Sequence, residues 1–440
     1  MVKVLKFGGS SLADAEQFRK VAAIINAEPE RRYVVASAPG KRFFEDEKVT
    51  DLLLHCHALA TDRNPFDETF RRISDRFNGI IKDLGLSLNI QPELDQVKEA
   101  IQNGIGKDYV ASRGEYFNSM ILADFLQVPF LDAAECIFFG NDGKLDSKKT
   151  HTVLENRLAM MPRAVIPGFY GILPGGEIKT FSRGGSDITG SIVAEAIEAD
   201  IYENWTDVSG MLMADPRIID NPAPIDIITY RELRELSYMG VTVLHEDAVF
   251  PVRRSGIPIN IRNTNRPEDK GTMIVSHTEE KSKDRIITGV AGKTGFTAIY
   301  IERDMMNSEL GYGRRVLETL ERRGINFEHL PSGIDTVTVV VNSKELEGKL
   351  DLVVADLKRA VRPDTIRVYE DLAMVAVVGR GMISEPGVAA KVFTALAKEH
   401  INIRMIDQGS SELNIIVGIA AKDYLTALKA IYKEFEPKKL

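Results

Sequence analysis

The pattern of apolar and polar positions at the start of the chain predicts a strand, a glycine loop and a helix in succession. Apolar residues within 2–7 indicate a short strand, which the glycine-rich segment 8–11 ends. Apolar residues then recur at helical spacing over 18–25, and residues 32–37 predict a second strand. A strand–helix–strand order requires a crossover connection, so we expect parallel strands and an α/β domain.

Farther along, residues 43–127 show repeated apolar spacing typical of helices. Strand patterns return in three short stretches, each followed by a glycine or polar loop: residues 164–166, 201–202 and 257–261. The pattern changes at the polar, charged segments 266–271 and 278–284, which read as connectors. We therefore expect a first domain over residues 1–275.

The remaining third of the chain contains an internal repeat with a shift of 76 residues, from Met306 to Met382. Eight further identities keep the same register: Ser308 with Ser384, Glu309 with Glu385, Gly311 with Gly387, Val316 with Val392, Leu320 with Leu396, Ile325 with Ile401, Asn326 with Asn402, and Gly333 with Gly409. Such a long unbroken register indicates two copies of one small module of strands and helices.

Composition narrows the functional classes. A chain of 440 residues with 44% hydrophobic and 27% charged residues is an ordinary globular composition of two or three domains. The net charge of −8 argues against a nucleic-acid binder. The start of the chain lacks a signal-peptide core, and no apolar run approaches the roughly 20 residues of a membrane span. We expect a soluble cytoplasmic protein without a membrane partner.

The first candidate for chemistry is Lys6-Phe7-Gly8-Gly9-Ser10-Ser11. Glycines at the end of a strand let backbone N–H groups approach an anion, and Lys6 adds a positive charge toward a phosphate. The segment lacks the spacing of a P-loop. A tight turn between strand and helix remains the structural alternative.

The second candidate is residues 182–189, where Arg183, Ser186 and Asp187 surround another glycine pair before a helix expected over 189–199. The planar guanidinium of Arg183 suits a carboxylate or phosphate. Ser186 and Asp187 could equally be helix caps. An arginine beside two glycines serves no capping purpose, which favours a binding role.

Weaker signals lie elsewhere. Thr206-Asp207 ends a predicted strand, where α/β proteins bind nucleotides, and Arg217 follows in a turn-like Asp-Pro-Arg. Glu115 could hold an ammonium group or simply favour a helix start. The two cysteines and seven histidines show no spacing typical of a metal site, so none is predicted.

Taken in order, these segments resemble the signatures of aspartate kinases along nearly the whole chain. The resembling segments are 6–11, 36–38, 48–53, 114–115, 168–169, 183–187, 206–207, 215–217 and 243–245, followed by 387–393 and 408–411 in the second repeat. The order of the segments together with the repeat makes the likeness specific.

The resemblance implies an amino acid kinase fold, with a parallel-rich central sheet between helices, followed by two α+β ACT modules of βαββαβ order. It places the first ACT module at 285–365 and 416–440, with the second, 366–415, inserted within it. No length remains for a fused dehydrogenase domain, so a monofunctional enzyme is expected.

The resemblance also assigns roles, with ATP and Mg²⁺ as cofactors and aspartate as the substrate. The catalytic set is Lys6, Gly8, Gly9 and Asp187. The expected aspartate-binding set is Thr50, Glu115, Phe169, Arg183 and Ser186. The expected ATP-binding set is Lys6, Gly9, Ser10, Thr206, Asp207 and Arg217. This sequence departs from the family pattern at two positions expected near the nucleotide. The family commonly has Lys where Thr242 stands and Tyr where Leu212 stands.

The implied reaction makes 4-phospho-aspartate, the first step toward lysine, threonine and methionine. The acceptor carboxylate is already ionised, so alignment and charge neutralisation replace a general base. Two alternatives remain: a superfamily member acting on glutamate or acetylglutamate, and a weakly catalytic amino-acid sensor.

The repeats predict regulation by a free amino acid, with lysine favoured, and a homo-oligomer formed through the ACT modules. The expected effector residues are Met306, Glu309, Gly311, Tyr312, Gly313, Glu328, Ser332 and Asp335. Loop amides at a helix start suit an α-carboxylate. Two acids, Glu328 and Asp335, would suit two ammonium groups, and Arg404 replaces the first of them in the second repeat.

Overall fold

The computed structural model describes residues 1–182, 184–241, 244, 246–278 and 285–437. For residues 246–250 it describes the backbone only. The chain divides into two compact units. The first contains Met1–Met211, Pro224–Tyr230 and Thr242–Thr278, and the second contains Leu212–Ala223, Arg231–Val241 and Glu279–Leu440. The main boundary lies close to the expected one at 275, but two short segments before it group with the second unit.

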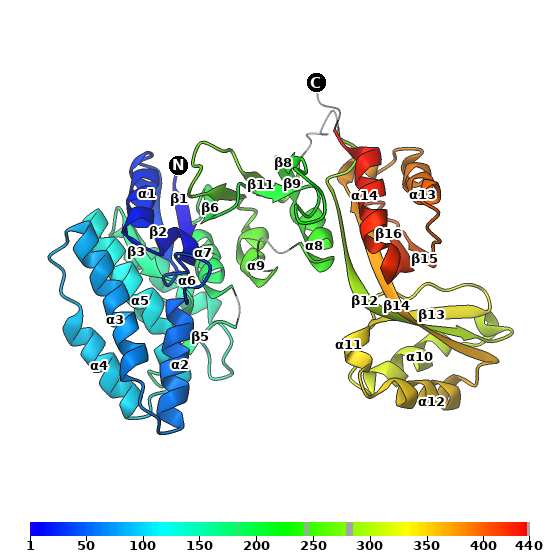
Figure 1. Ribbon diagram of the computed structural model, residues 1–440, viewed down its shortest axis with the longest axis horizontal. Coiled ribbons are helices and arrows are strands. Elements are labelled where there is room, and N and C mark those ends of the chain that lie inside the picture. Colours follow the sequence, from blue (N-terminus) through cyan, green and yellow to red (C-terminus); the bar gives the residue numbers. More distant parts are fainter. Residues whose placement is uncertain (183, 242–243, 245, 279–284, 438–440) are drawn as a thin grey trace. The chain divides into compact units, whose positions relative to one another are not determined.

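A seven-stranded sheet forms the centre of the first unit (Figure 1). In spatial order its strands are β3 (Ala164–Pro167), β2 (Arg31–Ala36), β1 (Lys3–Phe7), β6 (Ile201–Thr206), β10 (Ile259–Asn263), β11 (Thr272–Val275) and β9 (Ile227–Thr229). The first five strands are mutually parallel, and the β10–β11 pair alone is antiparallel. The expected parallel-rich α/β sheet is therefore confirmed.

Helices cover both faces of this sheet (Figure 1). One apolar core joins β1 and β2 to α1 (Ala15–Asn26), α2 (Val49–Thr61), α3 (Asp67–Leu84), α4 (Gln91–Gln102) and α5 (Lys107–Leu126). The strands β1, β2 and β6 also contact α7 (Gly185–Ala196), which packs against α6 (Ser147–Ala159) and α9 (Glu246–Ser255). The helical pattern over 43–127 thus corresponds to four helices.

Short elements complete the first unit and its connections. They are η1 (Gly9–Leu12), η2 (Ala133–Glu135), the antiparallel pair β4 (Tyr170–Ile172) and β5 (Ile178–Thr180), β7 (Met211–Leu212), β8 (Pro224–Ile225) and α8 (Tyr230–Tyr238). None of the helices in the described part of the chain combines the length and apolar character that crossing a membrane requires.

The second unit is built on a five-stranded antiparallel sheet. Its order is β13 (Thr336–Asn342), β12 (Gly289–Glu302), β14 (Thr365–Val378), β16 (Asn414–Ala420) and β15 (Met405–Asp407). The two long strands β12 and β14 pair along their whole lengths, with a register shift near Gly295, whose φ is +90°. This irregularity divides the sheet into two halves.

Each half carries its own helices (Figure 1). The half that we call the first module, residues 296–372, carries η3 (Met306–Ser308), α10 (Tyr312–Glu321), α11 (Ser343–Leu346) and α12 (Leu350–Val361). The second module, residues 289–294 and 373–435, carries η4 (Arg380–Met382), α13 (Val388–Lys398), η5 (Ala421–Asp423) and α14 (Tyr424–Phe435).

The repeat found in the sequence is a structural repeat. Gly311 and Gly387 precede α10 and α13 in the same left-handed conformation, with φ of 79° and 88°. In each copy the segment after the helix donates one N–H to the neighbouring strand: Glu328 to Val340 O and Arg404 to Gly418 O, both at 2.7 Å. Two equivalent modules are therefore present.

The nesting of the modules differs from the expected one. Strand β16 pairs with residues 372–378 of β14, so the C-terminal segment completes the second module and not the first. Residues 289–294 supply the remaining strand of that module by pairing with residues 373–378. The first module is continuous and is inserted into the second. The pairing of β16 with β14 is decided by the tertiary structure, and the 76-residue shift between the repeats does not specify it.

Candidate active site and regulatory modules

The carboxyl ends of five parallel strands bring the predicted segments of the first unit to one edge of the sheet. The glycine loop follows β1, residues 37–40 follow β2, Gly168-Phe169 follows β3, Asp207 follows β6 and Thr264 follows β10. Ligands of open α/β sheets bind outside this edge. The candidate site is therefore assembled by topology from segments far apart in the sequence.

Lys6 and Asp187 form an ion pair at this edge. Lys6 Nζ lies 2.6 Å from Asp187 Oδ1, and both side chains are mostly buried. Asn204 Nδ2 donates to the same oxygen at 2.8 Å. Residues 6 and 204 are register partners on β1 and β6, so both side chains stand on the sheet face that meets the start of α7. A lysine ammonium is thereby fixed beside the glycine loop.

The glycine loop packs against the turn after β2 without space for side chains. A Cβ on Gly9 would lie 2.9 Å from Ala38 O, and one on Gly40 would lie 2.6 Å from the Gly9 carbonyl carbon. Gly40 N donates to Gly9 O at 2.8 Å. Two backbone segments thus approach as closely as they can, which leaves a cradle of backbone groups suited to an anion.

The same loop is fixed to its other neighbours. Gly8 N donates to Trp205 O at 3.0 Å, which extends the pairing of β1 with β6 by one residue. The hydroxyls of Ser11 and Thr264 are 2.7 Å apart in a buried contact. Ser10 lies between these two anchored residues within η1. The loop is therefore preorganised.

Glu115 lies on the buried face of α5, with only 6% of its surface exposed. Burial raises its pKa to about 8, although a backbone hydrogen bond involving Ala38 acts in the opposite direction. Its Oε2 atom finds no hydrogen-bond partner among the residues that the structure describes. A buried carboxylate with a vacant acceptor position is suited to a cationic ligand. Thr50 is adjacent, because a Cβ on Gly114 would contact both Ala38 Cβ and Thr50 Oγ1.

Phe169 and Ser186 meet at the start of α7. A Cβ on Gly168 would lie 2.6 Å from Ser186 Oγ, and one on Gly185 would lie 2.4 Å from Phe169 Cδ2. Phe169 has a φ of 80°, which is strained for an aromatic residue, and its N–H donates to Thr189 Oγ1 at 3.0 Å. Helix α7 begins at Gly185, earlier than the expected residue 189. Arg183 lies outside the described residues.

The structure describes only part of the region expected to bind the nucleotide. Thr206 Oγ1 donates to Asp207 Oδ1 at 3.2 Å at the carboxyl end of β6. Arg217 belongs to the segment that groups with the second unit, where its Nη2 lies 2.6 Å from Asp215 Oδ2. Leu212 belongs to the same segment, and Thr242 lies outside the described residues. The structure therefore brings Lys6, Gly8, Gly9, Asp187 and Asp207 to one sheet edge, but it does not relate Arg217 to them.

Sequence reasoning missed several contributors. Asn204 has no signal in the sequence, because its role depends on being the register partner of Lys6 on the neighbouring strand. A second missed group, Asp46 with Arg76, also contacts the glycine-loop region. Arg76 sits within an ordinary amphipathic helix pattern, so no local signal distinguishes it.

The predicted effector residues of the first module fall into two places. Asn307 N donates to Ile334 O and Arg303 N donates to Asp335 O, so η3 adjoins the turn around Asp335. Glu309 is already engaged by Arg303 at 3.1 Å and by Arg315. Gly311 caps α10, whereas the Tyr312 side chain is buried. No atom lies within 4 Å of a Cβ added at Gly313.

Glu328 lies farther along the same module. Ser332 pairs with Val337, and Glu328 is four residues before Ser332, which in extended chain is about 13 Å. Burial raises the pKa of Glu328, and its Oε2 is buried without a partner within the described part of the chain. Ser332 also lines a hollow of 420 Å³ on the sheet, together with Tyr300, Thr338, Tyr369 and Arg404. Neither Glu328 nor Asp335 is among the residues that line this hollow.

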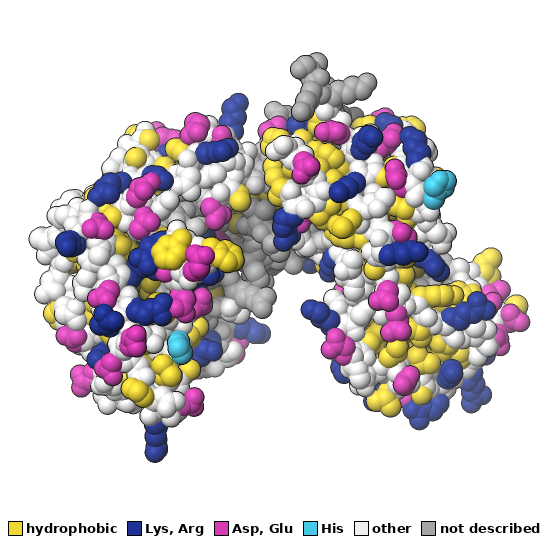
Figure 2. All heavy atoms as spheres, in the orientation of Figure 1, with side chains coloured by type: hydrophobic (Ala, Val, Ile, Leu, Met, Phe, Trp, Pro, Cys, Tyr) yellow, Lys and Arg dark blue, Asp and Glu magenta, His cyan; other side chains and the backbone are white. Residues whose placement is uncertain are grey.

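The donor set fits a nucleotide. A lysine ammonium beside a side-chain-free glycine cradle suits phosphate oxygens. The described residues contain no cluster of three or more His, Cys, Asp or Glu side chains able to hold a metal by themselves. Charged side chains of both signs are mixed over the face of the molecule shown in Figure 2.

Comparison with known proteins agrees with this arrangement. The amino acid kinase family profile matches residues 1–263, and an ACT domain profile matches residues 375–435, which fall within the second module. Aspartokinase 3 of Bacillus subtilis is 37% identical over 451 aligned positions, covering 99% of this chain and 98% of that protein.

Solved structures agree along the whole length. The aspartate kinase of Clostridium acetobutylicum is 51% identical with a TM-score of 0.89, covering 99% of this chain and 100% of that one. Aspartokinase III of Escherichia coli, in complex with aspartate and ADP, is 25% identical with a TM-score of 0.75 and 99% coverage of both chains. The same Escherichia coli protein in complex with lysine and aspartate has a TM-score of 0.72, with the same identity and coverage. A family profile over more than half of the chain and a full-length relative thus agree with the sheet topology, and the chain belongs to the aspartokinase family.

Proposed function

We propose that this protein transfers the γ-phosphoryl group of ATP to the β-carboxylate of aspartate, giving 4-phospho-aspartate and ADP. The observation that carries the proposal is the Lys6–Asp187 pair beside the Gly9–Gly40 cradle, at the carboxyl edge where a buried Glu115 also lies. The phosphates of a nucleotide require a cation and an anion cradle. The α-ammonium group of a zwitterionic substrate requires a carboxylate that is not already paired. The Escherichia coli relative binds aspartate and ADP.

In this proposal the aspartate lies against Glu115, Thr50, Phe169 and Ser186. Glu115 receives the α-ammonium group, which restores the charged form that burial disfavours in the free protein. Arg183 takes the α-carboxylate as a planar fork, a role proposed on its sequence position alone. The β-carboxylate is then left free to act as the nucleophile, and no base is needed because it is already ionised.

The remaining residues neutralise charge on the nucleotide. Lys6 Nζ and the backbone N–H groups of Gly9 and Ser10 hold the phosphoryl oxygens, while Asp187 and Asn204 keep the Lys6 ammonium in place. Thr206, Asp207 and Arg217 are proposed to hold the rest of ATP. Mg²⁺ bound to the phosphates would supply further positive charge. Fixed donors of this kind commonly contribute about 3 kcal/mol each to transition-state stabilisation.

A coupled assay of ADP release tests the proposal directly. Aspartate, glutamate and acetylglutamate are offered in turn with MgATP, and an acyl phosphate is trapped with hydroxylamine. Aspartate-dependent ADP release with a trapped hydroxamate is the expected result. Turnover with glutamate or acetylglutamate alone would assign another acceptor within the superfamily. Absence of turnover with every acceptor would support a sensor.

We also propose that a free amino acid bound to the first module inhibits the enzyme, and lysine is favoured. The partnerless Oε2 of Glu328 and the backbone turn at Asp335 offer acceptors for ammonium groups. The Clostridium relative is described as allosteric, and the Escherichia coli relative binds lysine. Assembly of subunits through the ACT modules is part of the same proposal.

A further inference from the structure

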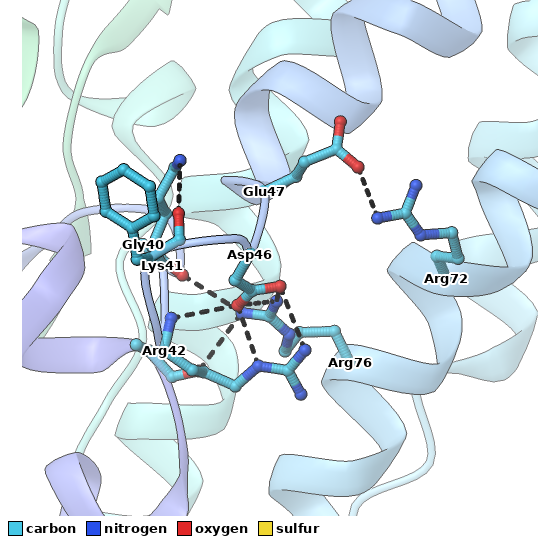
Figure 3. Close-up of polar contacts among 9 residues, drawn as sticks. Gly40, Lys41, Arg42, Asp46, Glu47, Arg72 and Arg76 are labelled. Atoms are coloured by element: carbon cyan, nitrogen blue, oxygen red, sulfur yellow. Dashed lines mark hydrogen bonds and ion pairs between the residues drawn. The ribbon is translucent and has the colours of Figure 1, made fainter.

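A cluster of charged side chains around a buried aspartate lies where the segment between β2 and α2 meets α3 (Figure 3). Asp46 is the centre of this cluster. Arg76 Nη2 donates to both Asp46 oxygens at 2.8 and 2.6 Å, and Arg42 donates through Nε at 2.9 Å and Nη2 at 3.1 Å. The Arg76 and Asp46 side chains are only 5% and 6% exposed.

Arg76 extends this cluster to the glycine loop with its other guanidinium nitrogen. Nη1 donates to Gly40 O at 3.1 Å and approaches Ala13 O at 3.5 Å. Ala13 directly follows η1, and Gly40 N donates to Gly9 O. One guanidinium therefore contacts both segments that form the cradle, the second at Gly40 itself and the first just after the glycine loop.

We propose that Arg76 is a positioning residue for the nucleotide, which holds the Gly9–Gly40 cradle in its phosphate-binding shape. The inference rests on the proposed function. The cradle is a contact between two backbones without side chains, joined directly by the hydrogen bond from Gly40 N to Gly9 O. Arg76 adds a second restraint through the carbonyl groups of both segments, while Asp46 fixes the orientation of the guanidinium.

The charge state of the cluster is suited to a constant restraint. Burial alone would raise the pKa of Asp46, but the hydrogen bonds from Arg42 and the charge of Arg76 outweigh it and place the pKa well below the ordinary range. Asp46 is therefore ionised throughout the working range of pH. The restraint is permanent and does not respond to pH.

The residues expected to bind aspartate have no hydrogen bond to Asp46 or Arg76 within the described part of the chain. Helix α2, which carries Thr50, is held at its start by Val49 N donating to Pro39 O at 3.2 Å, a bond that does not involve Arg76. Loss of Arg76 is therefore expected to affect ATP and to spare aspartate.

The chain supplies a matched control on the same two segments. Arg72 lies one turn before Arg76 on α3 and pairs with Glu47, the neighbour of Asp46 (Figure 3). This pair is about half exposed and contacts neither Gly40 nor Ala13. Arg72→Met and Arg76→Met therefore remove the same charge from the same helix, but only the second removes contacts to the cradle.

The experiment measures KM for MgATP, KM for aspartate, kcat, and ADP affinity by calorimetry. Arg76→Met is expected to raise KM for MgATP and weaken ADP binding by about tenfold, with KM for aspartate within twofold of wild type. Arg72→Met should leave all four values within twofold. Equal ATP constants in the two variants, or equal losses for ATP and aspartate, would overturn the proposal.

Folding and the proposed function are checked separately. Asp46 keeps its bonds to Arg42 in Arg76→Met, so no buried carboxylate is left without a partner. If that variant still fails to fold, Arg76→Lys carries the test, because one ammonium cannot reach Asp46 and both carbonyls together, and a smaller change in the same direction is expected. A wild type without aspartate-dependent turnover contradicts the proposed function alone, and ADP affinity in the variants then decides the role of Arg76.

Discussion

Lys6 Nζ lies 2.6 Å from Asp187 Oδ1, although 181 positions separate the two residues in the sequence. The pair is possible because β1 and the start of α7 meet at the carboxyl edge of the sheet. Asn204 binds the same carboxylate oxygen, so the ammonium group has a fixed position and a compensated charge in the absence of ligand. Lys6 is therefore oriented before substrate arrives and need not be reorganised during the reaction.

Replacing Lys6 with alanine tests whether this ammonium acts in the transition state. Lys6→Ala is expected to lower kcat by about 10²-fold or more, with a smaller effect on KM for aspartate, because the charge on the phosphoryl oxygens grows during transfer. Lys3→Ala is the control: Lys3 lies on the same strand but pairs with Glu203 at 3.4 Å, and it should retain wild-type kcat. A folded Lys6→Ala protein with ordinary turnover would remove Lys6 from the catalytic set.

Replacing Gly9 with alanine tests the cradle itself. The added Cβ would lie 2.9 Å from Ala38 O and 3.2 Å from the Gly40 backbone, so one of the two segments must move. We expect at least a tenfold rise in KM for MgATP, since the backbone donors would no longer converge. Gly79→Ala on α3 meets no atom within 4 Å and serves as the control with unchanged kinetics. An unchanged ATP constant in Gly9→Ala would show that nucleotide does not use this cradle.

Much of the first unit could be predicted from local sequence patterns, because each glycine loop comes directly after a run of apolar residues that indicates a strand. The patterns do not reveal Asn204, whose role depends on lying beside Lys6 in a neighbouring strand. Arg76 is hidden for a related reason, since a buried arginine within an amphipathic helix resembles a surface one until its partners are known.

The second unit shows the same limit at the level of topology. The 76-residue shift reveals two modules, but the order of nesting depends on β16 pairing with β14. The segments 212–223 and 231–241 also group with this unit, and they do so through tertiary contacts such as the ion pair of Glu232 with Arg380 at 3.0 Å. Neither feature has a signal in hydrophobic periodicity.

The pKa of Glu115 predicts a pH dependence of aspartate use. Because burial raises this pKa to about 8, the free enzyme carries mostly neutral Glu115 at pH 7. If the ionised form binds the α-ammonium group, kcat/KM for aspartate should rise with pH and level off above about 8. Glu115→Gln should lose this limb and lower kcat/KM by at least tenfold. A flat profile for the wild type between pH 6 and 9 would contradict the assignment.

The same group predicts a dependence of stability on pH. Between its ordinary pKa of 4.5 and the folded value of about 8, Glu115 holds more protons in the folded state than in the unfolded state. Its contribution to the free energy of unfolding therefore falls as pH rises through this window. Chemical denaturation should show Glu115→Gln more stable than wild type at pH 8 and closer to wild type near pH 4.5. Equal differences at the two pH values would argue against the raised pKa.

Inhibition by lysine through Glu328 is the remaining prediction. Glu328 Oε2 is buried and has no partner within the described residues, and burial raises its pKa, so an incoming ammonium group would relieve an unfavourable arrangement. Inhibition also requires two conformations that lysine binds unequally. A titration of kinase activity is expected to show inhibition of the wild type by lysine, with the midpoint raised about tenfold or more in Glu328→Ala, which corresponds to the loss of one charge-assisted contact.

Glu318→Ala, which removes an acid paired with Arg314 on the surface of α10, should keep the wild-type midpoint. Asp335→Ala should shift the midpoint less than Glu328→Ala does, because of these two acids only Glu328 has a carboxylate oxygen that is buried without a partner in the described residues. Lysine that fails to inhibit the wild type, or that inhibits both proteins at one midpoint, would exclude Glu328 from the effector site.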